Sequence, residues 1–299
     1  MPTLAVTGAS GRLGRLVVAD LLDRGVVPAG DVVAVVRDPA SVADLADRGV
    51  QVRRGDYDEP GTLPSALAGV DRLLLVSGSE PGRRVPQHTA VVEAAVAAGV
   101  GRLVYTSILG APTTRNPLAP DHRATEEVLR AAAVPVVVLR NGWYTENWTD
   151  QLGQYLATGE LLGATGGAGV SAAARADFAV AAASALLADH AELAAAADEQ
   201  AEGFLALELG GPAFTLEELA AAVTEATGTT VVSRDLGVDG YARALVGAGL
   251  DEGTAGFVAS LDGSIAAGEL RTGSGALERL LGRPATPLVE VVRAAAPAA

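Results

Sequence analysis

The chain has 299 residues, no cysteine, three histidines and a formal net charge of -14. A surface this acidic repels phosphate backbones and anionic lipids, so neither nucleic acid nor a membrane is expected as a partner. The lack of cysteine excludes disulfides and thiolate chemistry, and so few histidines predict no metal site. No targeting segment or membrane-spanning run is visible. The composition, with 49% hydrophobic residues, predicts a globular cytoplasmic protein.

The first fourteen residues carry the pattern that organises the chain. Residues 4–6 predict a buried strand, and glycines at positions 8, 11 and 14 lead into an amphipathic stretch at 12–24. A strand, a glycine turn and a helix place the diphosphate of a dinucleotide at a helix N-terminus. Gly8 permits the tight turn, Gly11 lets the backbone approach the phosphates, and Gly14 lets the helix pack close to the strand. An ordinary βα turn is the alternative, and three glycines at this spacing favour cofactor binding over it.

The second predicted strand, residues 32–36, ends in Arg37. The end of this strand lies beside the adenosine ribose in such folds, where an Asp or Glu selects NAD. An arginine instead suits a 2′-phosphate, because its planar fork of donors clamps phosphate oxygens, and Arg12 is a second candidate for that phosphate. A solvated charge is the alternative for Arg37. Its position 23 residues after Gly14 favours NADP(H) as the cofactor.

Strands and helices continue to alternate up to residue 150. We expect strands at 50–53, 70–76 and 102–105 and a helix at 85–98. Asp56 is a candidate acceptor for the adenine amino group, with Tyr57 near the base, or a cap of the next helix, and the sequence leaves both open. The pattern predicts an α/β fold with a doubly wound parallel sheet, in which residues 1–150 form an NADP-binding Rossmann domain.

Residues 151–299 predict a smaller C-terminal α/β lobe that binds the substrate. The Gly/Ala-rich connection at 156–170 is expected to be a mobile flap over the substrate. Residues 175–177 precede an alanine-rich helix that is expected to run to about 189, and 191–201 predicts a loop or a frayed helix. Residues 204–209 predict a strand that rejoins the main sheet. Thr215 and Glu218 form a capping box for a helix ending at 227, followed by a strand at 231–233 and helices from 239 and from 275.

Longer motifs resemble one family over nearly the whole chain. The sequences TGASGRLG (7–14), VVRDP (35–39) and AAGVGRLVYTS (97–107) resemble the NmrA-like branch of the atypical short-chain dehydrogenases. Two others, EPGRRVPQH (80–88) and LRNGWYTEN (139–147), are similar to the NADPH-dependent type 2 quinone oxidoreductases. The likeness extends through RADFA (175–179) and GRPATPL (282–288).

This resemblance implies a set of cofactor and substrate residues. It implies that the diphosphate is held by Gly8, Ala9, Ser10, Gly11, Arg12 and Leu13. It places the 2′-phosphate at Arg37 and the middle of the cofactor at Ser77, Gly78 and Ser79. The nicotinamide end is implied to be lined by Asn141, Gly142, Trp143, Tyr144, Thr145 and Glu146, with Arg175 near the substrate.

The chain departs from the usual catalytic pair of the wider superfamily. Ordinary members carry Tyr-x-x-x-Lys, and the corresponding positions here hold Leu118 and His122. Ketone reduction needs that proton donor because an alkoxide is a poor product. A hydride added to a quinone gives an anion stabilised by aromaticity, which water can protonate. The missing acid therefore counts against a carbonyl reductase and leaves quinone reduction open.

Both tryptophans of the chain fall within one six-residue window. Trp143, Tyr144 and Trp148 are candidates for stacking on a flat acceptor, and packing of a buried loop is the alternative. Tyr144 is a candidate donor to a quinone oxygen, and Asn141 is a candidate to orient the nicotinamide or the substrate.

Four further residues remain: two of them have two interpretations each, and the other two have no expected role in the chemistry. His122 is a candidate weak acid near the pocket, although a surface helix residue is the more usual role of a single histidine. Arg175 is a candidate for fixing a substrate oxygen, or for an Arg-Asp pair with Asp177 at a helix start. His88 and His190 are expected to be structural or solvated.

The sequence therefore predicts a flavin- and metal-independent enzyme that passes a hydride from NADPH to a quinone, with catalysis mostly by positioning. A homodimer is the candidate assembly. The alternative is a non-catalytic, NmrA-like regulatory protein that senses NADP(H) and docks on a partner. A third candidate, a reductase of aryl ethers or flavonoids, resembles the chain less, because those proteins carry a lysine where His122 stands.

Overall fold

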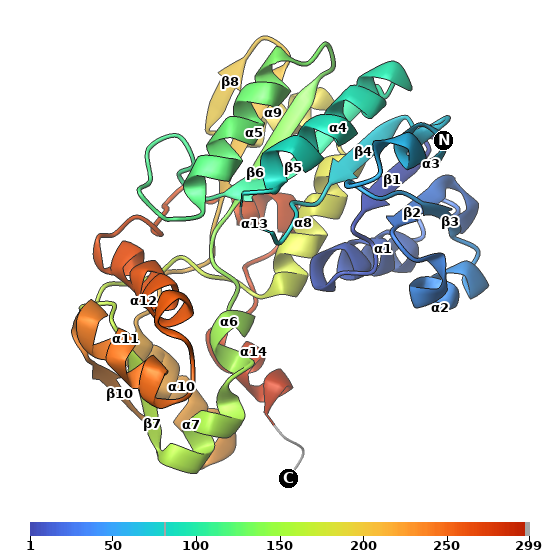
Figure 1. Cartoon of the computed structure of the whole chain (residues 1–299). Coiled ribbons are helices and arrows are strands. Elements are labelled where there is room, and N and C mark those ends of the chain that lie inside the picture. Colours follow the sequence, from blue (N-terminus) through green and yellow to red (C-terminus); the bar gives the residue numbers. More distant parts are fainter. Residues whose placement is uncertain (81, 297–299) are drawn as a thin grey trace.

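The computed structural model describes residues 1–80 and 82–296. Pro81, which belongs to the motif at 80–88, and residues 297–299 of the predicted C-terminal lobe lie outside the described residues. The chain forms a large sheet flanked by helices and a smaller lobe next to one end of that sheet (Figure 1).

The large sheet has the strand order β3-β2-β1-β4-β5-β6-β9-β8 and is parallel except for the pairing of β8 with β9. Its strands are β1 (Leu4–Thr7), β2 (Val32–Val36), β3 (Gln51–Arg54), β4 (Arg72–Leu75), β5 (Arg102–Ile108), β6 (Val136–Asn141), β8 (Glu199–Ala201) and β9 (Phe204–Leu209). The predicted doubly wound sheet is confirmed, as is the return of residues 204–209 to it. Strand order reverses between β1 and β4, and such a switch point is where ligands bind in these sheets.

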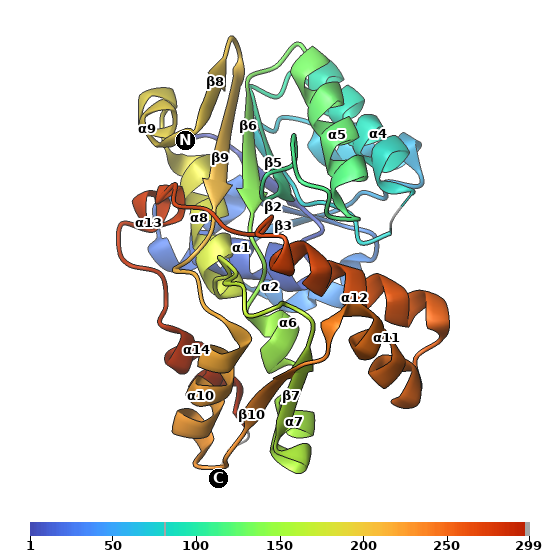
Figure 2. The same cartoon turned by 90° about the vertical axis from the view of Figure 1, so that its left-hand side faces the viewer.

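Helices cover both faces of the large sheet (Figure 2), which explains why inner strands such as β1 and β2 are continuous apolar runs, whereas the edge strands β3 and β8 are polar. One core cluster joins the sheet to α1 (Arg12–Arg24), α2 (Ala43–Asp47), α8 (Arg175–Leu187), α9 (His190–Ala196) and α13 (Ala276–Leu281). A second cluster joins the opposite face to α3 (Leu63–Leu67), α4 (Arg84–Ala97) and α5 (Ala119–Ala131). Short 3-10 turns occupy Ala29–Asp31, Pro39–Val42 and Pro60–Thr62.

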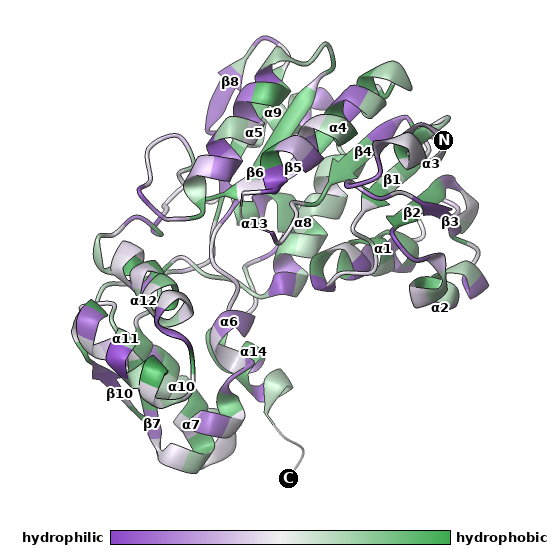
Figure 3. Ribbon diagram, viewed as in Figure 1, coloured by the Kyte–Doolittle hydropathy of each residue, from purple (hydrophilic) through white to green (hydrophobic). Residues whose placement is uncertain are grey.

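The smaller lobe surrounds a two-stranded parallel sheet of β7 (Glu160–Gly163) and β10 (Val232–Asp235). Its helices are α6 (Glu146–Thr149), α7 (Leu152–Thr158), α10 (Leu216–Thr227), α11 (Gly237–Gly247), α12 (Glu252–Ala266) and α14 (Leu288–Ala295). The capping box of Thr215 and Glu218 is present at the start of α10. A third core cluster holds this lobe together. Figure 3 shows that the central strands of the large sheet consist mostly of hydrophobic residues, whereas the helices mix hydrophobic and hydrophilic ones.

Two expectations about the second half of the chain are wrong. Residues 156–170 do not form a flap, because they contain the end of α7 and all of β7, and Leu161, Ala164 and Val170 are buried. Residues 191–201 are not a loop or a frayed helix, because Asp189 and Glu192 cap α9 with a complete capping box and β8 follows.

The second half contributes to both parts of the molecule. After β7 the chain returns to the large sheet with α8, α9, β8 and β9, and returns again with α13, which packs on α8 and β9. The division into domains of residues 1–150 and 151–299 stays a prediction. Within the described residues, no helix has both the length and the apolar character needed to cross a membrane.

Candidate active site

The turn after β1 requires glycine for geometric reasons. Gly8 adopts a φ of 58°, in the left-handed region that favours glycine, and its carbonyl accepts a 2.9 Å hydrogen bond from the Gly11 N–H. A Cβ on Gly14 would lie 2.4 Å from the Gly8 oxygen, and one on Gly11 would lie 3.2 Å from it. These glycines therefore let α1 begin directly against the turn, with its N-terminus open for a phosphate.

A cavity of about 380 Å³, the first cavity, lies above this turn at the carboxyl ends of the first four strands. Most of the predicted cofactor residues line it: Gly8, Ser10, Gly11, Arg12, Leu13, Arg37, Asp56, Ser77, Gly78 and Ser79. Ala9 is fully buried beneath the turn and does not line the cavity.

The two arginines of the first cavity are in different situations. Arg12 forms an exposed ion pair with Asp150, at the end of α6. Arg37 is exposed, and it has no hydrogen bond or ion pair to any described residue. Arg37 is thus the arginine whose donors are available for a ligand in this cavity.

Asp56 closes a turn, and it does not cap the next helix. Its Oδ1 accepts a 3.0 Å hydrogen bond from the Asp58 N–H, whereas α3 begins after Thr62 with no side-chain cap. Tyr57 also lines the first cavity, but its hydroxyl points inward and lies 3.1 Å from the Val76 carbonyl oxygen. Burial raises the pKa of Tyr57 above its usual value.

The loop after β4 is held by three side chains that sequence reasoning did not assign to the site. Thr106 Oγ1 accepts from the Ser77 N–H at 2.9 Å, His88 Nε2 accepts from the Gly78 N–H at 3.0 Å, and Arg84 Nε donates to the Gly78 carbonyl at 2.6 Å. The bond from Gly78 fixes the neutral tautomer of His88, whose Nδ1 lies 2.9 Å from Thr125 Oγ1. Burial lowers the pKa of His88 to about 4.

A signal for these residues was present in the sequence. Positions 84, 87 and 88 continue the inner stripe of α4 formed by Val91, Val92 and Ala95, so three polar residues occupy a face that should be apolar. Polar groups on a core-facing stripe need buried partners. The Gly78 backbone supplies them for Arg84 and His88, and Asp58 Oδ1 accepts from Gln87 Nε2 at 3.0 Å.

The second cavity, of about 510 Å³, shares Ser77 with the first. The predicted residues that line it are His122, Asn141, Gly142, Trp143, Tyr144 and Trp148. Its far wall comes from α11 and α12, through Tyr241, Val258, Leu261 and Asp262. Sequence reasoning missed this wall, since no local motif marks residues that only the tertiary fold brings opposite the NGWY segment.

Asn141 and Tyr144 lie side by side at the carboxyl end of β6. Asn141 is buried and its Oδ1 has no hydrogen-bond partner among the described residues. The Tyr144 ring meets Phe178 edge-on, with centroids 5.4 Å apart, and burial raises the pKa of its hydroxyl. The Asn141 oxygen is therefore a buried acceptor without a partner, on a residue that lines the cavity.

His122 is not a surface residue, contrary to the more usual role of a single histidine. It is 5% exposed, and its Nδ1 lies 2.8 Å from the Tyr105 hydroxyl. Which of the two groups donates depends on the imidazole tautomer: when Tyr105 donates to Nδ1, the imidazole proton sits on Nε2. Burial lowers the pKa of His122 to about 3, so it is a neutral hydrogen-bond donor at pH 7.

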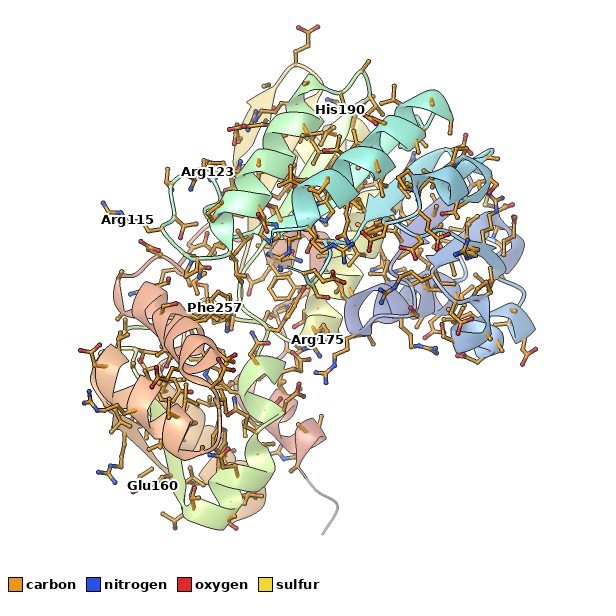
Figure 4. All side chains as sticks on the ribbon, in the orientation of Figure 1. Arg115, Arg123, Glu160, Arg175, His190 and Phe257 are labelled. Atoms are coloured by element: carbon orange, nitrogen blue, oxygen red, sulfur yellow. The ribbon has the colours of Figure 1, made fainter. Side chains whose placement is uncertain are left out.

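Thr145, Glu146 and Arg175 lie next to the second cavity but outside its lining. The Thr145 N–H donates to the Ala173 carbonyl, and the Glu146 carboxylate accepts from the Arg175 N–H at 2.9 Å. The Arg175 guanidinium stacks over the Tyr144 ring, 5.0 Å from its centroid, at the end of α8 that faces the smaller lobe (Figure 4). His190 lies at the other end of the large sheet.

The alternative Arg-Asp pair at the start of α8 does not form. Asp177 is fully buried and binds Arg283 at 2.7 Å and the Thr286 N–H at 2.8 Å. Asp177 belongs to the motif at 175–179, and Arg283 and Thr286 belong to the motif at 282–288. These polar residues therefore have a structural role: they hold α8 against the segment that follows α13.

A doubly wound sheet with a glycine turn and a basic second-strand end in one cavity defines a dinucleotide-binding protein of the Rossmann class. The sequence model of a family described as NAD(P)H-binding matches residues 8–187. The chain is also 40% identical, over 97% of both chains, to quinone oxidoreductase 2 of Escherichia coli. The chain belongs to this NAD(P)H-binding family, and the resemblance to the NmrA-like proteins and type 2 quinone oxidoreductases is confirmed.

Solved structures agree with this assignment. The NADPH-dependent quinone oxidoreductase of Escherichia coli in complex with NADPH has a TM-score of 0.87 at 40% identity, covering 97% of this chain and 98% of that one. A triphenylmethane reductase of Citrobacter sp. complexed with NADP(H) also has a TM-score of 0.87, at 35% identity, covering 98% of this chain and all of that one (100%).

Proposed function

We propose that the protein is an oxidoreductase that transfers a hydride from NADPH to a quinone without a flavin or a metal. The observation that carries this proposal is the pair of cavities that meet at Ser77, one built on the glycine turn and the other lined by flat rings. The relative from Escherichia coli, a quinone oxidoreductase by name, supports the class of acceptor.

The residues present fit NADPH, which supplies the hydride when it is bound. The cleared N-terminus of α1 suits the diphosphate, and Arg37 suits the 2′-phosphate. Asn141 Oδ1, a buried acceptor with no partner, suits the amide N–H₂ of a nicotinamide carboxamide. Residues 77–79 would hold the middle of the cofactor between these two ends, kept in place by Thr106 and His88.

The second cavity suits a flat acceptor that gains negative charge. Trp143 and Trp148 line the cavity, where the rings of a flat acceptor could pack against them, and Trp148 also packs edge-on with Phe214 in the core of the smaller lobe. Negative charge on a quinone oxygen is stabilised by a preorganised neutral donor, and His122 would provide one in the tautomer that carries its proton on Nε2. Tyr144 is the second candidate donor, and Arg175 acts on the acceptor only through the Tyr144 ring on which it stacks.

Purified flavin-free protein mixed with NADPH and a simple benzoquinone tests this proposal. We expect saturable loss of the absorbance of the reduced cofactor, faster than in a mixture without protein. Tight NADPH binding with no turnover, equal affinity for both redox forms and a co-purifying partner would instead support the regulatory alternative.

A cytoplasmic location and a homodimer belong to the same proposal. Four large hydrophobic side chains lie exposed on neighbouring elements of the smaller lobe: Val232, Val238, Val246 and Phe257, of which Figure 4 labels the last. Exposed large hydrophobic side chains are candidate contacts for self-association. Cell fractionation tests the location, and light scattering of wild type and Phe257→Glu tests the dimer, which this variant should weaken.

A further inference from the structure

The second cavity has a carboxyl group in its wall and no lysine or arginine among its described lining residues. The carboxyl belongs to Asp262 on α12, which lines the same cavity as Trp143 and Trp148. His122 also lines this cavity, but burial lowers its pKa to about 3, so it carries no charge at neutral pH. The electrostatics of the acceptor cavity are therefore set by Asp262.

Asp262 is oriented by the end of β7. Its Oδ2 accepts a 2.8 Å hydrogen bond from the Ala164 N–H. A Cβ on Gly163 would lie 3.0 Å from that oxygen and 2.3 Å from Leu216 Cδ1, so the strand end leaves room for the carboxyl only because residue 163 is glycine. Oδ1 has no hydrogen bond to the described residues, and a ligand in the cavity is its natural partner.

Charges outside the cavity do not neutralise this carboxyl. Arg175 is stacked on Tyr144, and Arg84 is bonded to the Gly78 carbonyl. The pKa of Asp262 is raised to about 6, mainly by burial and in smaller part by the negative charge of Asp235 at the end of β10. Tyr241 and Tyr155, on α11 and α7, are uncharged at neutral pH like any tyrosine, and burial raises their pKa values further.

We propose that Asp262 sets the charge preference of the acceptor site, so that flat acceptors with a cationic substituent are better substrates than anionic ones of the same shape. This inference rests on the proposed function. An unpaired, partly buried carboxylate gains from a nearby cation and repels an anion. The rings of Trp143 and Tyr241 add a second attraction, because a cation over an aromatic face is favourable.

Naphthoquinones that carry either a trimethylammonium or a sulfonate group test the proposal. We expect kcat/KM at pH 8 to favour the cationic quinone, and Asp262→Asn to reduce the cation-to-anion ratio by about tenfold or more. Comparing this ratio between variants cancels the intrinsic difference in reactivity of the two quinones. Glu252→Gln is the matched control, since it removes one exposed carboxylate from the same helix outside the cavity.

The net charge of -14 also attracts cations at long range, so salt separates the two effects. At about 1 M salt the screening length is about 3 Å, which suppresses attraction by distant charges far more than contact with Asp262. A ratio that Asp262→Asn leaves unchanged, or that Glu252→Gln lowers equally, would overturn the proposal.

Binding gives a readout that does not depend on turnover. Both tryptophans of the chain, Trp143 and Trp148, line the cavity, so quenching of tryptophan fluorescence reports its occupancy. We expect a trimethylammonium naphthalene to bind more tightly than a naphthalene sulfonate, and Asp262→Asn to remove the difference. Charge-selective quenching without any quinone turnover would contradict the proposed function and support this inference. Quinone turnover without charge selectivity would support the proposed function and contradict this inference.

Discussion

The expected role of Arg37 depends on its position directly after β2. The same guanidinium on a helix surface would be an ordinary solvated charge, but after β2 it borders the cavity of the glycine turn and has no partner in the described chain. Arg12, closer to that turn, is paired with Asp150. We therefore expect the residue at this one position to determine whether the protein prefers NADPH or NADH.

Replacing Arg37 tests this choice directly. Arg37→Asp should weaken NADPH binding by about tenfold or more, because charged hydrogen bonds to the 2′-phosphate are lost, and should narrow the gap to NADH. Calorimetric titration with both cofactors measures the two affinities, and NADH serves as the internal control. An unchanged preference would mean that the phosphate is held elsewhere.

His122 is expected to act as a neutral donor. His122→Phe should lower kcat with a quinone by about 10²-fold, the usual effect of removing one preorganised donor to developing charge, and leave NADPH affinity unchanged. Because its pKa in the folded protein is about 3, the wild-type kcat profile should contain no step from His122 between pH 5 and 8. A step in that interval that His122→Phe removes would contradict this role.

At the scale of elements, the glycine turn and α1 form one packed unit. Gly14→Ala should destabilise the protein by about 1–3 kcal/mol, because its Cβ would press on the Gly8 backbone, and should weaken NADPH binding. Gly153→Ala is the matched control: it lies in α7 with no atom within 4 Å of the added Cβ. Urea unfolding and cofactor titration of both variants are the measurements, and equal stability of the two would count against this packing.

The alternating elements of the large sheet could be predicted because both of its faces are buried. Strands such as β1 and β2 are then uninterrupted apolar runs, and their bounds were predicted to within a residue. The prediction of a flap at 156–170 is wrong because it treats the glycines of this segment as a sign of flexibility. Gly163 is instead required by close packing against Leu216 and Asp262.

The candidate site also has a part that could be predicted from the sequence and a part that could not. The lining of the first cavity follows from a local motif, since its residues sit at the ends of consecutive strands. The far wall of the second cavity does not, because Tyr241 and Asp262 lie about a hundred residues after the NGWY segment and reach it only through the packing of the smaller lobe. No periodicity within one element encodes such a long-range contact.

At the scale of the whole molecule, two buried neutral histidines make stability depend on pH. His88 and His122 have folded pKa values of about 4 and 3, below the ordinary 6.5, so unfolding takes up protons and acid destabilises the fold. Each should contribute about 2 kcal/mol of stability at pH 7 that is lost by pH 5. Asp262, whose pKa is raised to about 6, opposes part of this loss.

Urea unfolding of wild type and His88→Gln at pH 7 and pH 5 tests the dependence on pH. The difference in unfolding free energy between the two pH values should be smaller in the variant, which has one histidine fewer to titrate. Equal differences in the two proteins would show that His88 does not titrate on unfolding.

The central claim is that the hydride passes directly from NADPH to an acceptor in the adjoining cavity. The most direct test mixes flavin-free protein, loaded with NADPH deuterated at the transferred position or with ordinary NADPH, rapidly with a quinone in a single turnover. We predict one hydroquinone formed per bound cofactor and a slower reaction with the deuterated form. Bound NADPH that stays reduced, or that reacts no faster than free NADPH, would contradict the account.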